Sequence, residues 1–395
     1  MPHTACRTHS LHPTPCFKPL THRGITQNNH VMAHHTHHYC IILAGGAGRR
    51  LWPTSTETLP KQFIDFFGLG RTQLQQTYDR MARIFPKGHI YINTNRDYVD
   101  IVREQLPEVA DDHIIDEPVH RNTVPSAVWT LHRIRHNAGS EKATVMFTPS
   151  DHVILDEDTF RLEIGEGFDF VTHNDSIITL GVKPTRAEPG YGYIQLGDPM
   201  EHNIYKVQSF TEKPEREFAK MFLQSGEFYW NTGLFLANVD SLWTYLCSLL
   251  PNELRTFDQE HPNWTIEEEE DFMNDHFPLY PNLPLDLTLL ERCDKVCVMK
   301  CDFGWADVGT WHSIYEAMRK GENDNVVIDS DVIIDDARNN VVKLPKGRMA
   351  VINGLDGYIV VENDNVLLIC KKEDSSALVR KYVNEVQMKK GEKFI

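Results

Sequence analysis

The chain has 395 residues, of which 41% are hydrophobic, and its charged residues sum to a formal net charge of −16. This composition is typical of a soluble globular protein, and the length suggests one large domain with a smaller one. The negative charge argues against a nucleic-acid-binding protein, which needs a basic face, and no apolar run approaches the roughly 20 residues that span a membrane.

Residues 1–38 differ from everything that follows them. They contain nine of the twenty histidines, no acidic residue and little apolar material. Such a segment cannot bury enough surface to offset its ordering entropy, so we expect a disordered extension, or sequence upstream of a true start at Met32. No secretory signal is visible. A histidine-rich tract can bind metal, but no apolar scaffold would fix the ligands here.

From Tyr39 onward, short apolar runs alternate with amphipathic stretches. The predicted strands are Cys40–Leu43, His89–Asn93, Thr144–Thr148, Ser176–Leu180, Lys206–Phe210, Gly233–Ala237 and Val296–Lys300. The predicted helices are Leu74–Ile84, Tyr98–Gln105, Thr123–His136, Glu215–Gln224 and Ser241–Leu250. This alternation predicts an α/β fold with a largely parallel sheet. Ligands of such sheets bind beyond the carboxyl ends of the strands.

The later part of the chain has a different texture. The acidic run Glu267–Asp271 is interpreted as a solvated loop face. After about Asn323, short β-type runs separated by Asp, Asn and Gly predict a small all-β module. An amphipathic helix at about Ser375–Lys389 closes it, with Asp374 as a candidate N-cap.

The eight cysteines are scattered and do not resemble a disulfide framework. Cys297 and Cys301 fall on one predicted strand, about 13 Å apart at roughly 3.3 Å per residue. They can therefore neither pair with each other nor share a metal ion. We expect buried or free thiols and a reducing, cytoplasmic setting.

The run "IILAGGAGRRLWP" (41–53) joins a predicted strand to a glycine-rich turn. Such a turn directs backbone N–H groups at an anion. It is neither a Walker motif nor a dinucleotide fingerprint, because the required lysine and third glycine are missing. Arg50 and Lys61 add cations suited to phosphate. The turn alone predicts a phosphate site, and the alternative is a tight turn that needs positive φ.

Together, "LAGGAGRRLWP" and "PKQF" (60–63) resemble the signature of the sugar-nucleotide pyrophosphorylases, a nucleotidyltransferase family. The chain looks most like the mannose-1-phosphate guanylyltransferases within that family. Six further motifs carry the resemblance: "EPVHRNTVPSA" (117–127), "TPSDHVI" (148–154), "GVKPTRAEPGYGYIQ" (181–195), "FTEKP" (210–214), "FYWNTGLF" (228–235) and "FGWADVGTW" (303–311). The resemblance extends from Tyr39 to the C-terminus.

The resemblance implies a fold and an organisation. We expect a GT-A-like (Rossmann-like) α/β catalytic domain over residues 39–322, with a mixed, mostly parallel sheet. A small left-handed β-helix-like module with a terminal helix would follow over residues 323–395. Longer bifunctional relatives also carry a phosphomannose-isomerase cupin, for which this chain has no room.

The implied reaction is GTP + α-D-mannose 1-phosphate ⇌ GDP-mannose + diphosphate. A sugar-phosphate oxygen attacks the α-phosphorus in line, and because this nucleophile is already ionised no general base is required. The difficulty is to bring two polyanions together and to stabilise the charge of the transition state. The resemblance therefore implies cationic side chains and Mg²⁺ as cofactor, with GTP and mannose 1-phosphate as ligands and a homodimer as the assembly.

The resemblance also assigns roles to individual residues. Asp151 and Asp307 would bind Mg²⁺, since hard carboxylate oxygens suit this ion; judged singly, each could be a turn or capping aspartate. Arg50 and Lys61 would neutralise the triphosphate and the departing diphosphate. Lys213 would bind the sugar phosphate, and the alternative is a surface lysine in a turn.

The remaining implied residues contact the two substrates. Those for the sugar are Gly192, Glu212 and Asn231. Those for the nucleotide are Leu43, Ala44, Gly45, Gly46, Glu117, Asn122, Thr123 and Pro125. His152, Trp230 and Trp305 are interpreted as structural neighbours. Arg49 replaces a common Thr or Ser of the family, and it could strengthen phosphate binding or face solvent.

Other functions remain open at the level of sequence. The same chemistry could use another hexose 1-phosphate or another nucleoside triphosphate. A non-catalytic regulatory subunit that binds GDP-mannose is a different class, and loss of Arg50, Lys61, Asp151, Lys213 or Asp307 would have favoured it; all five are present. A structural β-helix assembly protein depends only on residues 323–395.

Overall fold

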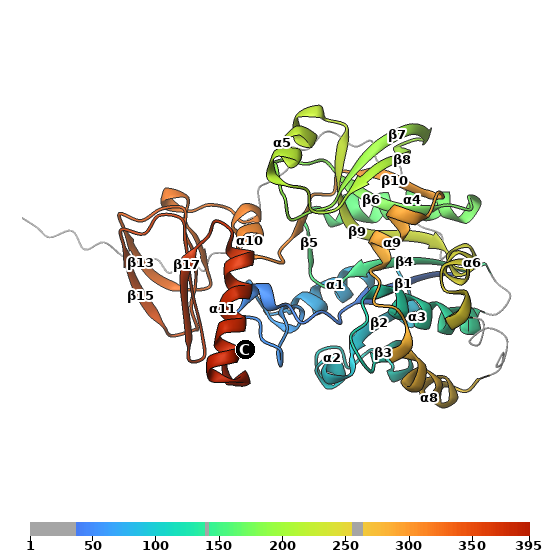
Figure 1. Ribbon diagram of the computed structural model, residues 1–395, viewed down its shortest axis with the longest axis horizontal. Helices are drawn as coiled ribbons and strands as arrows, with labels where there is room; N and C mark the ends of the chain where they lie inside the picture. The colour runs from blue at the N-terminus through green and yellow to red at the C-terminus, as the bar shows by residue number, and fades with distance from the viewer. Residues whose placement is uncertain (1–36, 139–141, 255–263) are drawn as a thin grey trace, which may run out of the picture.

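The computed structural model describes residues 37–138, 142–254 and 264–395 (Figure 1). Of the predicted N-terminal extension, residues 1–36 lie outside this range. His38 begins the first strand, one residue earlier than the predicted boundary. Its Nδ1 atom lies 2.5 Å from Thr144 Oγ1, and its ring stacks on Phe168 at 4.4 Å. These contacts attach His38 to the ordered domain.

A nine-stranded sheet forms the centre of the larger unit, in the order β3-β2-β1-β4-β9-β6-β10-β8-β7. The strands are β1 His38–Leu43, β2 Ile90–Asn95, β3 Ile114–Glu117, β4 Thr144–Pro149, β6 Ile177–Val182, β7 Tyr193–Glu201, β8 Ile204–Thr211, β9 Phe228–Asn238 and β10 Val296–Cys301. Strands β3, β2, β1 and β4 are parallel, whereas β9 runs antiparallel to both β4 and β6. The seven predicted strands and the α/β class are confirmed.

Helices cover both faces of this sheet (Figure 1). Helices α1 Gln73–Met81, α2 Val99–Gln105 and α4 Glu157–His173 contribute to one core cluster, and α3 Thr123–Ala138, α6 Val239–Leu249 and α9 Leu285–Arg292 to the other. Strand β1 contributes side chains to both clusters, because alternate residues of a strand point to opposite faces of the sheet. Cys40 and Ile42 belong to the first cluster, and Tyr39 and Ile41 belong to the second. Helix α5 Arg216–Ser225 packs near β9.

The prediction of a solvated loop at the acidic run Glu267–Asp271 is wrong. Residues 267–271 lie in helix α8 Ile266–His276 rather than in a loop. Glu269 is buried, and its carboxylate accepts a hydrogen bond of 2.9 Å from the buried Arg133 guanidinium of α3. A buried guanidinium needs a counter-ion, and this requirement places one glutamate of the run inside the protein.

The C-terminal module is built from short strands: β12 Val326–Ile328, β13 Asp331–Asp335, β14 Val341–Lys343, β15 Met349–Asn353, β16 Tyr358–Asn363 and β17 Val366–Lys371. Strands β12, β14 and β16 are parallel neighbours, and so are β13 and β15. Asp331 pairs with Met349 and Val341 with Ile359, each 18 residues apart, whereas Val326 pairs with Val341, 15 residues apart. Two parallel ladders whose neighbouring strands recur every 15 to 18 residues are the arrangement of a β-helix-like coil.

Helix α11 Ser375–Lys390 follows the module, as predicted. Asp374 occupies its N-cap position, as predicted, but it has φ 56° and its side chain makes no capping hydrogen bond. Cys297 and Cys301 form no disulfide and are free thiols, as expected. Within the described ranges, no helix combines the length and the apolar character that a membrane crossing requires.

Candidate active site

The glycine-rich loop follows β1, where the strand order 3-2-1 turns to 4, the position at which open α/β sheets bind ligands. The side chain of Gln62 holds two carbonyl groups of the glycine-rich loop. The Gln62 Nε2 atom donates hydrogen bonds of 2.8 Å to both Ala44 O and Gly46 O. Within the described part of the chain, the N–H groups of Gly45, Gly46 and Ala47 have no hydrogen-bond acceptor. The loop therefore keeps its carbonyls inside and its donors available to an anion.

Only one glycine of this loop needs the left-handed conformation. Gly48 has φ 63°, and an added Cβ would lie 2.6 Å from Ser55 Oγ. This turn starts the short helix η1 Arg49–Leu51 and separates the two arginines. Arg49 is about half exposed and forms an ion pair with Glu57, so its guanidinium is engaged at the surface.

Arg50 points into a cluster of charged groups. Gly309 marks its centre: a Cβ added there would lie 2.7 Å from Asp307 Oδ1 and 3.2 Å from both Arg50 Nη2 and Lys61 Nζ. Lys61 also forms an ion pair with Asp151, and both side chains are 13% exposed. The structure thus brings Arg50, Lys61, Asp151 and Asp307 together, although they come from three distant segments.

The charges of this cluster depend on each other. Burial alone would raise the pKa of Asp151, but Lys61, His152 and Arg50 outweigh this effect and hold the pKa of that carboxyl below its ordinary value. The Asp151 carboxylate is therefore ionised at neutral pH. An ionised oxygen donor is what a hard divalent cation requires.

A small two-stranded sheet sets the two aspartates side by side. Strand β5 His152–Ile154 pairs antiparallel with β11 Trp305–Asp307, and Asp307 lies directly opposite His152. Trp305 Nε1 donates to His152 Nδ1 at 3.2 Å. Because an indole nitrogen can only donate, Nδ1 of His152 carries no proton and is not available as a ligand. Burial also lowers the pKa of this imidazole, which is consistent with a structural neighbour.

The aspartate pair fits a magnesium ion better than a closed protein cage. Within the described ranges, no group of three or more His, Cys, Asp or Glu side chains could hold a metal. Mg²⁺ is commonly bound by one or two carboxylates together with water and substrate phosphates. Asp307 Oδ1 accepts a hydrogen bond of 2.7 Å from Gly309 N, which orients this carboxylate.

A second group of predicted residues gathers around Gly192. An added Cβ at Gly192 would lie 2.8 Å from Glu212 Oε2, so no other residue fits without displacing that carboxylate. Gly192 O accepts from Asn231 N at 2.9 Å. Lys213, with φ 45°, forms an ion pair with Glu212 and is 57% exposed. These four predicted sugar-side residues lie together.

Tyr191 connects the two groups, and sequence reasoning missed it. Its backbone oxygen accepts from Lys213 N at 3.2 Å, while its hydroxyl donates to Asp307 O at 3.2 Å. Its ring packs edge-on against Trp230 and Trp305, which confirms a packing role for both tryptophans. Gln62 was also missed as a separate position, although it lies within the motif "PKQF".

Glu117 ends β3 beside the glycine loop. An added Cβ at Gly45 would lie 3.5 Å from Glu117 Oε2. This carboxyl is only 4% exposed. Burial raises its pKa to about 8, and a hydrogen bond with the Ser126 hydroxyl acts in the opposite direction. The side chain is therefore mostly protonated at neutral pH in the free protein.

The rest of the predicted nucleotide segment docks on the loop before α9. Asn122 Nδ2 donates to Asn282 Oδ1 at 2.5 Å, and Thr123 Oγ1 accepts from Leu285 N at 2.7 Å. Pro125 is buried in the first turn of α3. Among the residues predicted for the first loop, Leu43 is half-buried and Ala44 is buried.

Comparisons with known proteins show which family the chain belongs to. The family model described as Nucleotidyl transferase matches residues 39–324. The chain is 31% identical over 368 residues to "Mannose-1-phosphate guanylyltransferase 2" of Escherichia coli O157:H7, which covers 90% of this chain and 74% of that protein. It is also 31% identical over 341 residues to "Mannose-1-phosphate guanylyltransferase RfbM" of Salmonella typhimurium (strain LT2), with 84% and 69% covered.

A solved structure has the same fold. A crystal structure described as a "mannose-1-phosphate geranyltransferase", from Thermus thermophilus, superposes with a TM-score of 0.75 at 26% sequence identity. The match covers 89% of this chain and 99% of that one. The chain is therefore an enzyme of the nucleotidyl transferase family, with curated relatives named mannose-1-phosphate guanylyltransferase.

Proposed function

We propose that the protein is a mannose-1-phosphate guanylyltransferase, which converts GTP and α-D-mannose 1-phosphate to GDP-mannose and diphosphate. The observation that carries the proposal is the convergence of Arg50, Lys61, Asp151 and Asp307, near a glycine loop whose N–H groups have no acceptor among the described residues. Such a site suits phosphoryl chemistry, in which the protein supplies position and charge. The printed names of the relatives suggest the two substrates.

The reaction needs no protein base. An ionised oxygen of the sugar phosphate forms a bond with the α-phosphorus of GTP. The bond from that phosphorus to the bridging oxygen breaks, and diphosphate leaves with the electron pair. The N–H groups of Gly45 and Gly46 and the guanidinium of Arg50 would bind the triphosphate, and Lys61 would neutralise the charge that develops on the leaving group.

Enzymes of this family generally use a divalent metal ion. We infer Mg²⁺ with Asp151 and Asp307 as its protein ligands, and when bound it would neutralise phosphate charge as a Lewis acid. Lys61 balances the Asp151 carboxylate in the free protein. The same ammonium lies beside Gly309, from which a small change of rotamer would redirect it toward a phosphate oxygen.

The sugar side would orient the nucleophile. Lys213 is exposed at the edge of the site, where its ammonium could meet a phosphate of charge near −2. Glu212 would accept hydrogen bonds from mannose hydroxyls, and the Asn231 amide would donate to them or accept from them. Gly192 would allow the backbone to approach the sugar closely. The ion pair of Lys213 with Glu212 keeps both groups ordered until substrate arrives.

The nucleotide side would select the base. Glu117 lies beside Gly45, where the base or ribose of a nucleotide on the loop would fall. A carboxylate can accept from the N1–H and N2–H groups of guanine, a pattern that adenine lacks. Asn122, Thr123 and Pro125 would complete this edge.

We further propose that the catalytic domain spans residues 39–322, and that the module of residues 323–395 supports a homodimer. The outer face of β13 and β15 exposes Ile333, Met349 and Val351 by half or more. Ile333 and Val351 are direct cross-strand neighbours, so they form a continuous apolar strip. Light scattering on the Val351→Asp variant tests this: a monomer is expected, and an unchanged dimer would exclude this face.

The deciding experiment is release of diphosphate from the purified protein with Mg²⁺. GTP, ATP, UTP and dTTP are crossed with the 1-phosphates of mannose, glucose and fucose. Release chiefly with GTP and mannose 1-phosphate is expected. Release with another pair would keep the chemistry and change the substrates. Folded protein that binds GDP-mannose but releases no diphosphate would refute the proposal in favour of a regulatory subunit.

A further inference from the structure

Two segments carry most of the charged cluster. The first catalytic loop, residues 49–67, contains Arg50 and Lys61, and the second catalytic loop, residues 307–318, contains Asp307 and Gly309. The first is largely irregular chain with two short 3-10 helices, and in the second three irregular residues, 308–310, lead from Asp307 into helix α10 Trp311–Ala317. Irregular segments are mobile unless their surroundings fix them.

We propose that the C-terminal module positions these two loops for catalysis, in addition to any role in assembly. This inference rests on the proposed function and concerns the same site. The family model ends at residue 324, so it assigns nothing to the strands and the helix that follow.

Polar contacts attach the first catalytic loop to the module. Trp52 Nε1 donates to Phe394 O at 2.6 Å. Asn363 Nδ2 donates to Pro53 O at 3.1 Å, and Lys343 Nζ to Phe66 O at 3.0 Å. The module thus contacts this loop near Arg50 and again beyond Lys61.

A hydrogen bond joins the two loops to each other. Trp311 Nε1, in the second catalytic loop, donates to Trp52 O at 3.3 Å. The backbone of Trp52 is therefore held by one loop while its indole is held by the module. A displacement of either partner would be transmitted to Arg50, two residues before it.

The apolar contacts are more extensive, because loops and module share one buried cluster. Leu51 directly follows Arg50 and Val308 directly follows Asp307, and both are fully buried in it. From the module, the cluster includes Val326, Ile328, Val341, Ile359, Val361, Leu368, Cys370, Val379 and Val383. The residues next to two of the charged groups are therefore packed on module side chains.

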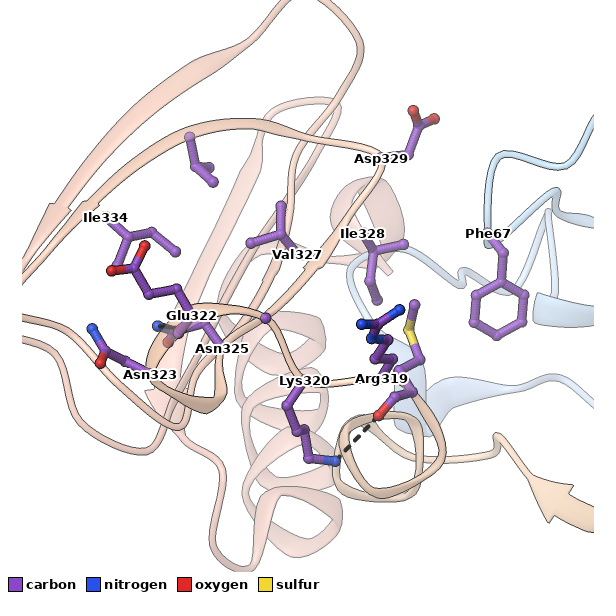
Figure 2. Close-up of a pocket in the computed structure, with 13 residues that line it drawn as sticks. Phe67, Arg319, Lys320, Glu322, Asn323, Asn325, Val327, Ile328, Asp329 and Ile334 are labelled. Carbon is purple, nitrogen blue, oxygen red and sulfur yellow. Dashed lines mark hydrogen bonds between the residues drawn. The ribbon is translucent and has the colours of Figure 1, made fainter. Parts of the chain in front are cut away.

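This packing lies on one side of the junction between the catalytic domain and the module. Helix α11 lies along the segment that carries η1, between the module and the large sheet (Figure 1). On another flank Phe67, Ile328 and Asp329 line an open groove of about 810 Å³ (Figure 2). The contacts with the module thus hold both segments at the junction, and Phe67 and Ile328 of the shared cluster also border this groove.

The module has a second, separate core that provides a matched control. Val342 belongs to a cluster with Ala337, Leu344, Ile352 and Val360, inside the module itself. Val341 and Val342 are adjacent on β14 and both are fully buried, but they point to opposite sides. The substitutions Val341→Ala and Val342→Ala therefore remove the same atoms at the same depth.

The test compares these two variants with the wild-type protein. We expect a similar loss of melting temperature from both. Val341→Ala should in addition raise KM for GTP and lower kcat, by about threefold or more together, since small misplacements of catalytic groups can cost up to about 100-fold. Val342→Ala should leave kcat/KM within about twofold of the wild-type value. Lys343→Met, which keeps the aliphatic stem but loses the bond to Phe66 O, should resemble Val341→Ala.

Binding of a fluorescent GTP analogue gives a readout that does not depend on turnover. Weaker binding by Val341→Ala than by Val342→Ala, at equal folded fraction, supports positioning by the module. Equal effects of the two variants, or no effect of either, would overturn it. If wild-type protein binds the analogue but releases no diphosphate, the proposed function fails while this comparison still decides the inference.

Discussion

Replacing Glu117 by glutamine should change how the stability of the protein depends on pH. The carboxyl is 4% exposed, and burial raises its pKa from 4.5 to about 8. Because the folded-state pKa lies above the unfolded-state value, the folded protein binds this proton more tightly. The stabilisation from the protonated carboxyl is complete below pH 4.5 and is lost as the pH rises toward 8.

The size of the effect follows from linkage. Each pH unit between the two pKa values costs the wild-type protein about 1.4 kcal/mol, so the loss from pH 5 to pH 8 is about 4 kcal/mol. A glutamine does not titrate and escapes this loss. With an unfolding entropy of about 2.1 cal/mol/K per residue, the Glu117→Gln variant should gain about 5 °C in melting temperature relative to wild type over that range.

Differential scanning fluorimetry at pH 5, 6, 7 and 8, without nucleotide, measures this difference. Comparing the variant with wild type at each pH cancels every other titrating group. A difference in melting temperature that stays constant from pH 5 to 8 would refute the reasoning that burial keeps this carboxyl protonated.

The same carboxyl predicts a signature of GTP binding. Guanine N–H donors would favour the ionised carboxylate and lower its pKa, so binding at pH 7 should release up to about 0.9 protons. Calorimetry in buffers with different ionisation enthalpies counts these protons. The Glu117→Gln variant should release none from this position, and equal release by variant and wild type would exclude a direct role of Glu117.

Three further predictions concern the phosphate groups. Asp151→Asn should lower kcat by about 100-fold or more while the protein stays folded, with some loss of melting temperature because Lys61 loses its partner; wild-type turnover would exclude Asp151 as a metal ligand. Lys213→Ala should raise KM for mannose 1-phosphate by about tenfold, through loss of one charge-assisted hydrogen bond, and KM for GTP much less; equal changes would contradict its assignment. Gln62→Met should raise KM for GTP by about tenfold, because Gly46 O loses its donor and Ala44 O keeps only the 3.3 Å bond from Thr94 Oγ1. Its control is Gln73→Met, a buried glutamine without a described side-chain partner, whose KM should not change.

The sequence predicted seven of the nine strands of the large sheet, because hydrophobic periodicity is a local signal, but it missed β3 and β7. The sequence could not predict that Glu269 is buried, since its burial depends on the ion pair with Arg133 in a distant helix. Asp374 has the residue type of an N-cap, but its backbone is in the left-handed region, which sequence does not report. Local sequence patterns therefore predicted most of the helices and strands. The burial of Glu269 and the backbone conformation of Asp374 depend on contacts with residues that are distant in the sequence, or on geometry that the sequence does not encode locally.

For the candidate site, motif resemblance located the charged residues, and the structure shows which of them meet. Arg49 is a clear case: two adjacent arginines look equivalent in sequence, but the turn at Gly48 sends one to Glu57 and the other to the cluster. Tyr191 could not be found in advance, because its two contacts reach Lys213 and Asp307, which are far apart in the chain. The roles assigned to the individual residues stay predictions.

The shared core of loops and module has a consequence for recombination between relatives. In a chimaera that joins residues 39–322 of one homologue to the C-terminal module of another, the shared buried cluster would combine side chains that evolved separately. Leu51 and Val308 would then face foreign neighbours. An active chimaera should require that residues 49–67, 307–318 and 326–395 all come from the same homologue. The set of residues that must be exchanged together would then differ from the two domains defined along the sequence.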